Sequence, residues 1–132
     1  MKILCVDDSQ ICCMVLIKQL QLLGFDEAES VADAFSAMQL LERNEGIELV
    51  IADQHLGKDS SGLDLLTWVR QNPLPRVSSL PFLIVTGDSN PELILQSAML
   101  EVDGFLIKPL TLDALESQLN RVFRHRPQSV NV

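Results

Sequence analysis

The chain has 132 residues, of which 47% are hydrophobic, and its 18 acidic and 10 basic side chains give a formal net charge of −8. This length suits one domain, with a core large enough to need no disulfide. The acidic balance argues against direct nucleic-acid binding, which needs a basic surface, and no apolar run approaches the length of a membrane span.

Short apolar runs alternate with amphipathic stretches along the chain. The apolar runs predict strands, at residues 3–6, 25–29, 49–52, 82–85 and 105–107. The amphipathic stretches predict helices, at about residues 10–23, 30–44, 63–70, 91–101 and 111–123. The first strand has no polar face, as expected where helices cover both faces of a parallel sheet. Five strands alternating with five helices therefore predict an α/β fold with a doubly wound parallel sheet.

Helix boundaries are predicted from capping residues and helix breakers. Ser9 and Thr111 can cap the first and last helices. The segment Ser30–Asp33 resembles a capping box with Asp in the place of Glu or Gln. Asn72–Pro75 should end the third helix, and Asn90–Glu92 places a cap, a proline and an acid at the start of the fourth.

Polar side chains follow four of the five predicted strands. Asp7 and Asp8 follow the first strand, Asp53 the third, Thr86 the fourth and Lys108 the fifth. In open α/β sheets, ligands bind outside the carboxyl ends of the strands, near the point where the strand order reverses. We therefore expect three carboxylates, one hydroxyl and one ammonium to converge on one edge.

Three carboxylates in one pocket repel one another, so the site must protonate one of them or bind a cation. Oxygen ligands suit Mg²⁺, which keeps several waters and favours phosphate oxygens. Lys108 and Thr86 can each meet a phosphate oxygen, as phosphoryl transfer requires. Asp53 is the expected nucleophile because it stands alone at a central strand end and carboxylates can form aspartyl phosphates.

The order Asp7–Asp8, Asp53, Thr86 and Lys108–Pro109 resembles the receiver domains of bacterial response regulators, which belong to two-component signalling systems. The resemblance covers residues 2 to about 124. It implies a flavodoxin-like α/β fold, with a five-stranded parallel sheet of order 2-1-3-4-5 and five helices. We expect a receiver domain over residues 1–124, with 125–132 as a polar tail or the start of a linker.

The resemblance also implies roles at the acidic site. Asp7, Asp8 and Asp53 would hold Mg²⁺, and the backbone carbonyl of His55 would complete the protein ligands. Asp53 would accept a phosphoryl group from a sensor histidine kinase or a histidine phosphotransfer protein. The protein would then be no enzyme in the ordinary sense, because it catalyses only its own phosphorylation and dephosphorylation, and we expect it in the cytoplasm.

Signal output is likewise implied by the resemblance. Thr86 and Phe105 would form a switch pair, Lys108 would sense the phosphate, and the Lys108–Pro109 peptide would be cis. A homodimer or an effector would bind through the fourth helix, the fifth strand and the fifth helix. No direct contact with nucleic acid or membrane is expected.

Some positions depart from the family pattern, and two other functions compete. Leu56 and Gly57 stand where many receivers have Met and Pro, and Gly62 lies nine residues after Asp53 rather than eight. A phosphohydrolase of the haloacid dehalogenase type would need D-x-D after the first strand and a cap insertion, and this chain has neither. A degenerate receiver that serves only as an interaction module would not need all five polar residues at the strand ends, namely Asp7, Asp8, Asp53, Thr86 and Lys108.

Two packing predictions follow from the residues. Cys5, Cys12 and Cys13 show no zinc-ligand spacing, so we expect reduced, buried thiols, which favours the cytosol. At 100° per residue, the helix Pro91–Glu101 gathers most of its apolar side chains on one arc, which should face the sheet. The members of that arc are Ile94, Leu95, Ala98, Met99 and Val102. Leu93 and Leu100 would then be exposed and available for a dimer or partner contact.

Overall fold

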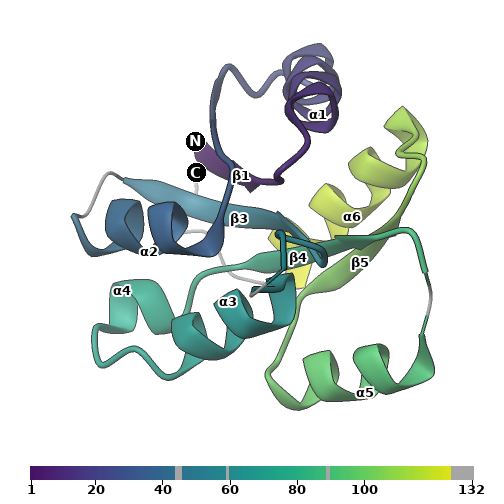
Figure 1. Cartoon of the computed structure of the whole chain (residues 1–132). Helices are drawn as coiled ribbons and strands as arrows, with labels where there is room; N and C mark the ends of the chain where they lie inside the picture. The colour runs from purple at the N-terminus through teal and green to yellow at the C-terminus, as the bar shows by residue number, and fades with distance from the viewer. Residues whose placement is uncertain (44–45, 59, 89, 126–132) are drawn as a thin grey trace.

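The computed structural model describes residues 1–43, 46–58, 60–88 and 90–125. Within them, five parallel strands form one sheet in the order β2-β1-β3-β4-β5 (Figure 1). The strands are β1 (Lys2–Val6), β2 (Glu27–Val31), β3 (Ile47–Asp53), β4 (Phe82–Thr86) and β5 (Gly104–Ile107). The helices are α1 (Gln10–Leu22), α2 (Ala34–Glu42), α3 (Gly62–Arg70), α4 (Pro75–Ser78), α5 (Pro91–Met99) and α6 (Leu112–His125). The predicted fold class and strand order are confirmed.

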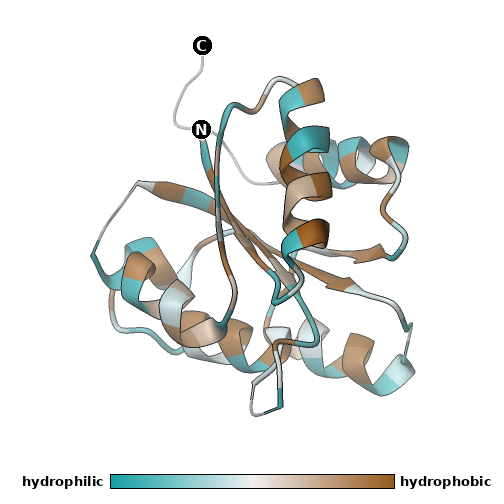
Figure 2. Cartoon of the chain, turned by 45° about the horizontal axis from the view of Figure 1, so that its top comes forward, coloured by the Kyte–Doolittle hydropathy of each residue, from teal (hydrophilic) through white to brown (hydrophobic). Residues whose placement is uncertain are grey.

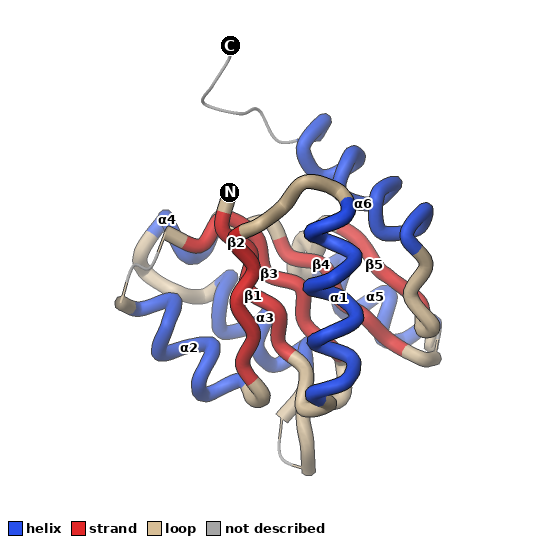
Figure 3. Tube along the Cα trace, turned by 90° about the horizontal axis from the view of Figure 1, so that it is seen from above, coloured by secondary structure: helices blue, strands red, loops and turns tan. Residues whose placement is uncertain are grey.

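Helices cover both faces of the sheet, with α1 and α6 on one side and α2, α3 and α5 on the other (Figures 1 and 3). Alternate strand residues point to opposite faces. Ile3 and Cys5 of β1 therefore pack with α1 and α6, whereas Leu4 and Val6 pack with α2 and α3. Strands β1, β3, β4 and β5 are predominantly hydrophobic (Figure 2), as burial on both faces requires. The edge strand β2 is largely polar and partly exposed.

The predicted capping box at the second helix is wrong. Ser30 and Val31 belong to β2, where they pair with Cys5 and Val6 of β1. Asp33 caps α2 instead, and its Oδ1 accepts a hydrogen bond from the backbone N–H of Ser36 at 2.7 Å. Strand β2 extends two residues beyond its predicted end. Pairing with β1 gives the backbone N–H and C=O groups of these residues hydrogen-bond partners, which the first turn of a helix would not provide.

The third helix begins one residue earlier than predicted, and a short helix follows it. Ser61 caps α3 and forms a capping box with Asp64. Pro75, expected to end the third helix, occupies the first turn of α4. At that position its missing N–H removes no hydrogen bond within the helix. Among the described residues the helices thus number six rather than five, so the fourth and fifth predicted helices are α5 and α6. The predicted caps Ser9, Asn90 and Thr111 are confirmed.

The predicted orientation of α5 is wrong. Leu93 is only 7% exposed and Ser97 is fully buried, whereas Leu95 and Met99 are 63% and 77% exposed. Leu93, Ser97 and the half-buried Leu100 follow i, i+4, i+7 spacing, so the inward strip is narrow. The helix has more apolar side chains than this strip can cover, and those of Ile94, Leu95 and Met99 therefore face solvent.

Arg70, the last residue of α3, fixes the C-terminal end of α5. Its guanidinium donates to the carbonyl oxygens of Leu100 at 2.9 Å and Glu101 at 2.9 Å, and it pairs with Asp103 at 3.3 Å. The same side chain also reaches the carbonyl of Leu80 at 2.7 Å. One nearly buried side chain thus joins α3, the start of β4 and the end of α5.

The C-terminal boundary of the predicted domain falls at the edge of the described residues. The structure continues α6 to His125, and the remainder of the predicted tail, residues 126–132, lies outside the described residues. Within the part of the chain that the structure describes, no helix is both long enough and apolar enough to cross a membrane.

Candidate functional site

Three acidic side chains meet at the carboxyl ends of β1 and β3. Asp7 and Asp8 follow β1 directly, and Asp53 is the last residue of β3. One carboxylate oxygen from each lies within 4.8 Å of the others. Asp7 and Asp53 are nearly buried while Asp8 is exposed. This donor set, made only of carboxylate oxygens with one side open to water, fits Mg²⁺.

Backbone contacts hold Asp7 and Asp53 in place. The N–H of Asp7 donates to the carbonyl of Val31 at 3.1 Å, and its Oδ1 accepts from the N–H of Ser9 at 2.9 Å. Next to Asp53, the N–H of Gln54 donates to the carbonyl of Val85 at 2.8 Å. The first carboxylate is therefore oriented by the start of α1, and the second by the pairing of β3 with β4.

Lys108 joins these two carboxylates. Its Nζ lies 3.3 Å from Oδ2 of Asp7 and 3.4 Å from Oδ1 of Asp53. The backbone N–H of Lys108 donates to the carbonyl of Thr86 at 2.9 Å, which ties the residue to the end of β4. The peptide bond to Pro109 is cis, as predicted. The ammonium therefore stands where it can meet an anion bound at Asp53.

The charges of the site perturb one another. Burial raises the pKa of Asp53, and the carboxylate of Asp7 raises it further; Lys108 opposes both effects. Burial acts to lower the pKa of Lys108, but the carboxylates of Asp53 and Asp7 outweigh burial and raise it. Lys108 is thus held charged, while the ionised form of Asp53 is disfavoured until a cation is bound.

The structure places Thr86 and Phe105 near the site but not in contact with its charges. Thr86 is 2% exposed, and its hydroxyl donates to the carbonyl of Asp88 at 2.9 Å and accepts from the N–H of Asp88 at 3.1 Å. Phe105 is half-buried against the core on the α2 and α3 side. It pairs with Ile84, two residues before Thr86. The predicted switch residues therefore lie on neighbouring strands.

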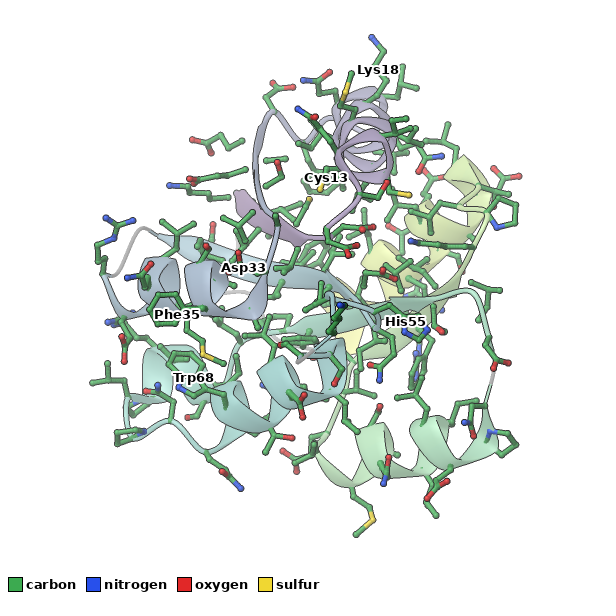
Figure 4. The ribbon with its side chains drawn as sticks, viewed as in Figure 1. Cys13, Lys18, Asp33, Phe35, His55 and Trp68 are labelled. Atoms are coloured by element: carbon green, nitrogen blue, oxygen red, sulfur yellow. The ribbon has the colours of Figure 1, made fainter. Side chains whose placement is uncertain are left out.

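The loop after Asp53 folds back on itself. His55 forms an antiparallel bridge with Ser61, and the N–H of Gly62 donates to the carbonyl of Gln54 at 3.0 Å. A Cβ at Gly62 would lie 2.7 Å from the backbone oxygen of Asp53, so only glycine fits. The side chain of His55 is exposed at this edge (Figure 4), and its role as a backbone ligand stays a prediction.

Sequence reasoning missed a contact of Cys12. The thiol lies 3.7 Å from Nζ of Lys108 and is partly exposed, so the expectation of three buried thiols is wrong for this residue. Cys13 faces the sheet with Leu16 and Leu20, at helical spacing. Since adjacent helical residues point about 100° apart, only one of the two cysteines could be buried there. The other had to face the site or solvent.

Comparisons with known proteins identify relatives of this chain. The family model of the response regulator receiver domain matches residues 3–120. The chain is 29% identical to chemotaxis protein CheY-3 of Vibrio cholerae over 123 residues, which is 93% of this chain and 92% of that protein. The structure of chemotaxis protein CheY4 of Vibrio cholerae is similar, with a TM-score of 0.82 and 26% identity over 92% of this chain and 98% of the other.

A further solved structure, a response regulator receiver protein from Pseudomonas putida, has a TM-score of 0.80 and 30% identity over 90% of this chain and 94% of that one. The family model covers most of the chain, and the described sheet has the strand order of a flavodoxin-like fold. The same fold and most of the chain's length are thus shared with chemotaxis regulators and a receiver protein. The chain accordingly belongs to the receiver-domain family of response regulators in two-component signalling.

Proposed function

We propose that this protein is a phosphorylation-dependent switch, in which Asp53 accepts a phosphoryl group from a sensor histidine kinase or a histidine phosphotransfer protein. One observation carries the proposal. Lys108 bridges Asp7 and Asp53 within a cluster whose carboxylate oxygens lie within 4.8 Å. A nucleophile, a cation-binding set and a phosphate-binding ammonium thus share one site, as phosphoryl transfer requires.

In the proposed reaction, an oxygen of Asp53 attacks the phosphorus while the bond from phosphorus to the donor nitrogen breaks. Asp7, Asp8 and Asp53, with the carbonyl of His55, would hold Mg²⁺. When bound, the ion supplies neutralisation of the charge on the carboxylates and the phosphoryl oxygens. Lys108 then meets a phosphoryl oxygen in place of part of its present contact with Asp53. The protein catalyses this transfer and the later hydrolysis, and no other reaction.

The signal would follow from the new phosphoryl oxygens. Thr86 would leave Asp88 and donate to one of them, and Phe105 would turn inward. Phosphorylation would in this way favour one of two conformations, a population shift that requires the phosphoryl group to interact differently with each.

The output surface would be the α5, β5 and α6 face, used for a homodimer or an effector. Its apolar members are not those predicted from the sequence. Ile94, Leu95 and Met99 of α5 are exposed, as is Ile107 of β5. We place the protein in the cytoplasm, where its free thiols would stay reduced.

The acceptor is tested with acetyl phosphate and Mg²⁺, followed by intact mass measurement. Wild type should gain one phosphoryl group, and Asp53→Asn should gain none. The matched control is Asp33→Asn, which removes a carboxylate distant from the cluster and leaves a good helix cap. An unreduced phosphorylated mass in Asp53→Asn would exclude Asp53 as the acceptor.

Metal binding is tested separately, by titration of Mg²⁺ without a phosphodonor. Removing Asp8 should weaken the affinity at least about tenfold, because one of few charged ligands is lost. Unchanged affinity in Asp8→Ala would place the metal elsewhere. A wild type that binds Mg²⁺ but is never phosphorylated would support the degenerate receiver instead.

A further inference from the structure

A cavity of about 480 Å³ opens beside Asp53. It lies between α1 on one side and the Lys108–Leu110 segment on the other, with the ends of β1, β3 and β4 as its floor. Its apolar walls come from Val6, Ile11, Val15, Leu16, Ile51, Val85, Pro109 and Leu110. This volume is in the range of pockets that take small organic molecules, about 300–1,000 Å³.

The polar groups of the cavity are confined to the phosphorylation site. The side chains of Asp7, Asp53 and Lys108 line it, and among the other described lining residues only Cys12 has a side chain with a polar atom. Asp53, the proposed nucleophile, is therefore a wall of the same cavity that carries the apolar surface. A molecule whose phosphoryl group is at Asp53 would extend its remainder along α1.

Two contacts hold the walls of the cavity together. The amide Nε2 of Gln19 on α1 donates to the carbonyl of Leu110 at 3.1 Å, and the thiol of Cys12 lies 3.7 Å from Nζ of Lys108. At the mouth, Ile11 is 74% exposed and Val15 is 46% exposed. A ligand that enters would remove these apolar atoms from contact with water. Burial of apolar surface is the main source of binding free energy at such a site.

We propose that this cavity holds the organic part of a small acyl phosphate, so that the protein takes its phosphoryl group from donors with an apolar acyl chain in preference to acetyl phosphate. The inference rests on the proposed function and adds a class of small phosphodonor to it. In the reaction, an oxygen of Asp53 bonds to phosphorus and the bond from phosphorus to the acyl oxygen breaks. The electron pair leaves with the fatty carboxylate, which needs no proton at neutral pH.

The chemistry of the walls selects this class. A sugar or nucleotide would bring hydroxyl groups and ring nitrogens into a space where the apolar residues offer them no partner, at a cost in desolvation. An alkyl chain has no such groups, and it would cover side chains that now face water. The carboxylate that leaves would meet Lys108 on its way out.

Initial rates with acetyl phosphate and butyryl phosphate test the proposal. Their leaving groups are straight-chain carboxylates of nearly equal basicity, so a difference in rate reports contact with the protein rather than intrinsic reactivity. At equal donor concentrations well below saturation, in Mg²⁺, the phosphorylated mass should form up to about tenfold faster with butyryl phosphate, as expected for two buried methylene groups.

Matched variants assign the effect to the cavity. Val15→Asn and, independently, Ile11→Asn place an amide at the mouth and should bring the ratio of the two rates toward one. Leu22→Asn changes an exposed apolar residue of the same helix that does not line the cavity, and it should keep the wild-type ratio. Circular dichroism shows whether each variant is folded.

Failure of the inference and failure of the proposed function are distinguishable. Equal rates for the two donors in wild type, with both labelling Asp53, would overturn the inference alone. A preference for butyryl phosphate that survives both Val15→Asn and Ile11→Asn would overturn it as well, because the selectivity would then arise outside this cavity. Absence of labelling by either donor would instead contradict the proposed function.

Discussion

Replacing Asp53 by Asn should raise the free energy of unfolding of the metal-free protein by about 2 kcal/mol at neutral pH. The site holds three carboxylates against one ammonium. Oxygens at the 4.8 Å limit of the cluster repel by about 3.5 kcal/mol per pair at an effective dielectric of 20, whereas the contact with Lys108 at 3.4 Å contributes about 5 kcal/mol of attraction. Asp53 faces two carboxylates and one ammonium. Its negative charge therefore destabilises the folded protein by about 2 kcal/mol, the difference between the two repulsions and the one attraction.

The effect should depend on pH in a definite direction. Burial, and after it the carboxylate of Asp7, raises the pKa of Asp53 above its ordinary value of 3.8. The folded protein therefore holds this proton more tightly than the unfolded chain does. The destabilisation is full above the folded pKa and disappears as the pH falls from that value through 3.8. The advantage of Asp53→Asn should accordingly shrink in acid.

Urea unfolding followed by circular dichroism measures this, in EDTA at pH 7 and at pH 4. Equal slopes of free energy against urea would show that the midpoints report stability. Asp33→Asn is the control, because its exposed side chain caps α2 and Asn caps a helix equally well. Added Mg²⁺ should stabilise wild type more than the variant. If Asp53→Asn is no more stable than wild type at pH 7 without metal, the electrostatic account of the site is wrong.

Three further outcomes are expected. Gly62→Ala should lower the free energy of unfolding by about 1–3 kcal/mol and slow the phosphorylation of Asp53, because the new Cβ meets the backbone oxygen of that residue at 2.7 Å; urea midpoints and labelling rates measure the two effects. Glu101→Gly should raise the urea midpoint by the equivalent of about 0.5–1 kcal/mol, since Glu101 has a φ of 57°; an unchanged midpoint would mean that this backbone carries no strain. Joint substitution of Ile94 and Met99 by Ser should weaken phosphorylation-dependent association in sedimentation velocity without changing the labelling of Asp53, and undiminished association would place the output surface elsewhere.

The carboxyl ends of the strands at the site could be predicted from the sequence because two independent signals identify each of them. An apolar run identifies the strand, and a polar residue that follows it marks the carboxyl end, as with Asp7, Asp53 and Thr86. Parallel strands then bring these ends to one edge whatever the loops do. The contacts of Lys108 with two carboxylates could not be predicted in the same way, because they depend on side-chain directions and not on position along the strand.

Helix orientation and loop structure depended on tertiary contacts that a single sequence does not display. The side chains of α5 are mostly apolar, so the predicted apolar arc leaves Leu93 outside, although this residue is only 7% exposed. Serine is a common helix-capping residue, but Ser30 pairs with Cys5 of β1 and therefore belongs to β2. Pro75 is predicted to end the third helix, but the start of a helix tolerates proline as readily as a turn does.

The two ends of α5 are held differently, and this difference gives the proposed switch a direction. At the C-terminal end, Arg70 binds the carbonyls of Leu100 and the next residue. Before the N-terminal end, the hydroxyl of Thr86 binds the backbone of Asp88. On the proposed mechanism, phosphorylation takes the Thr86 hydroxyl from Asp88 and leaves every contact of Arg70 intact. The released end carries Ile94, whose side chain is already exposed, so the surface change should be largest there and should fade toward Leu100.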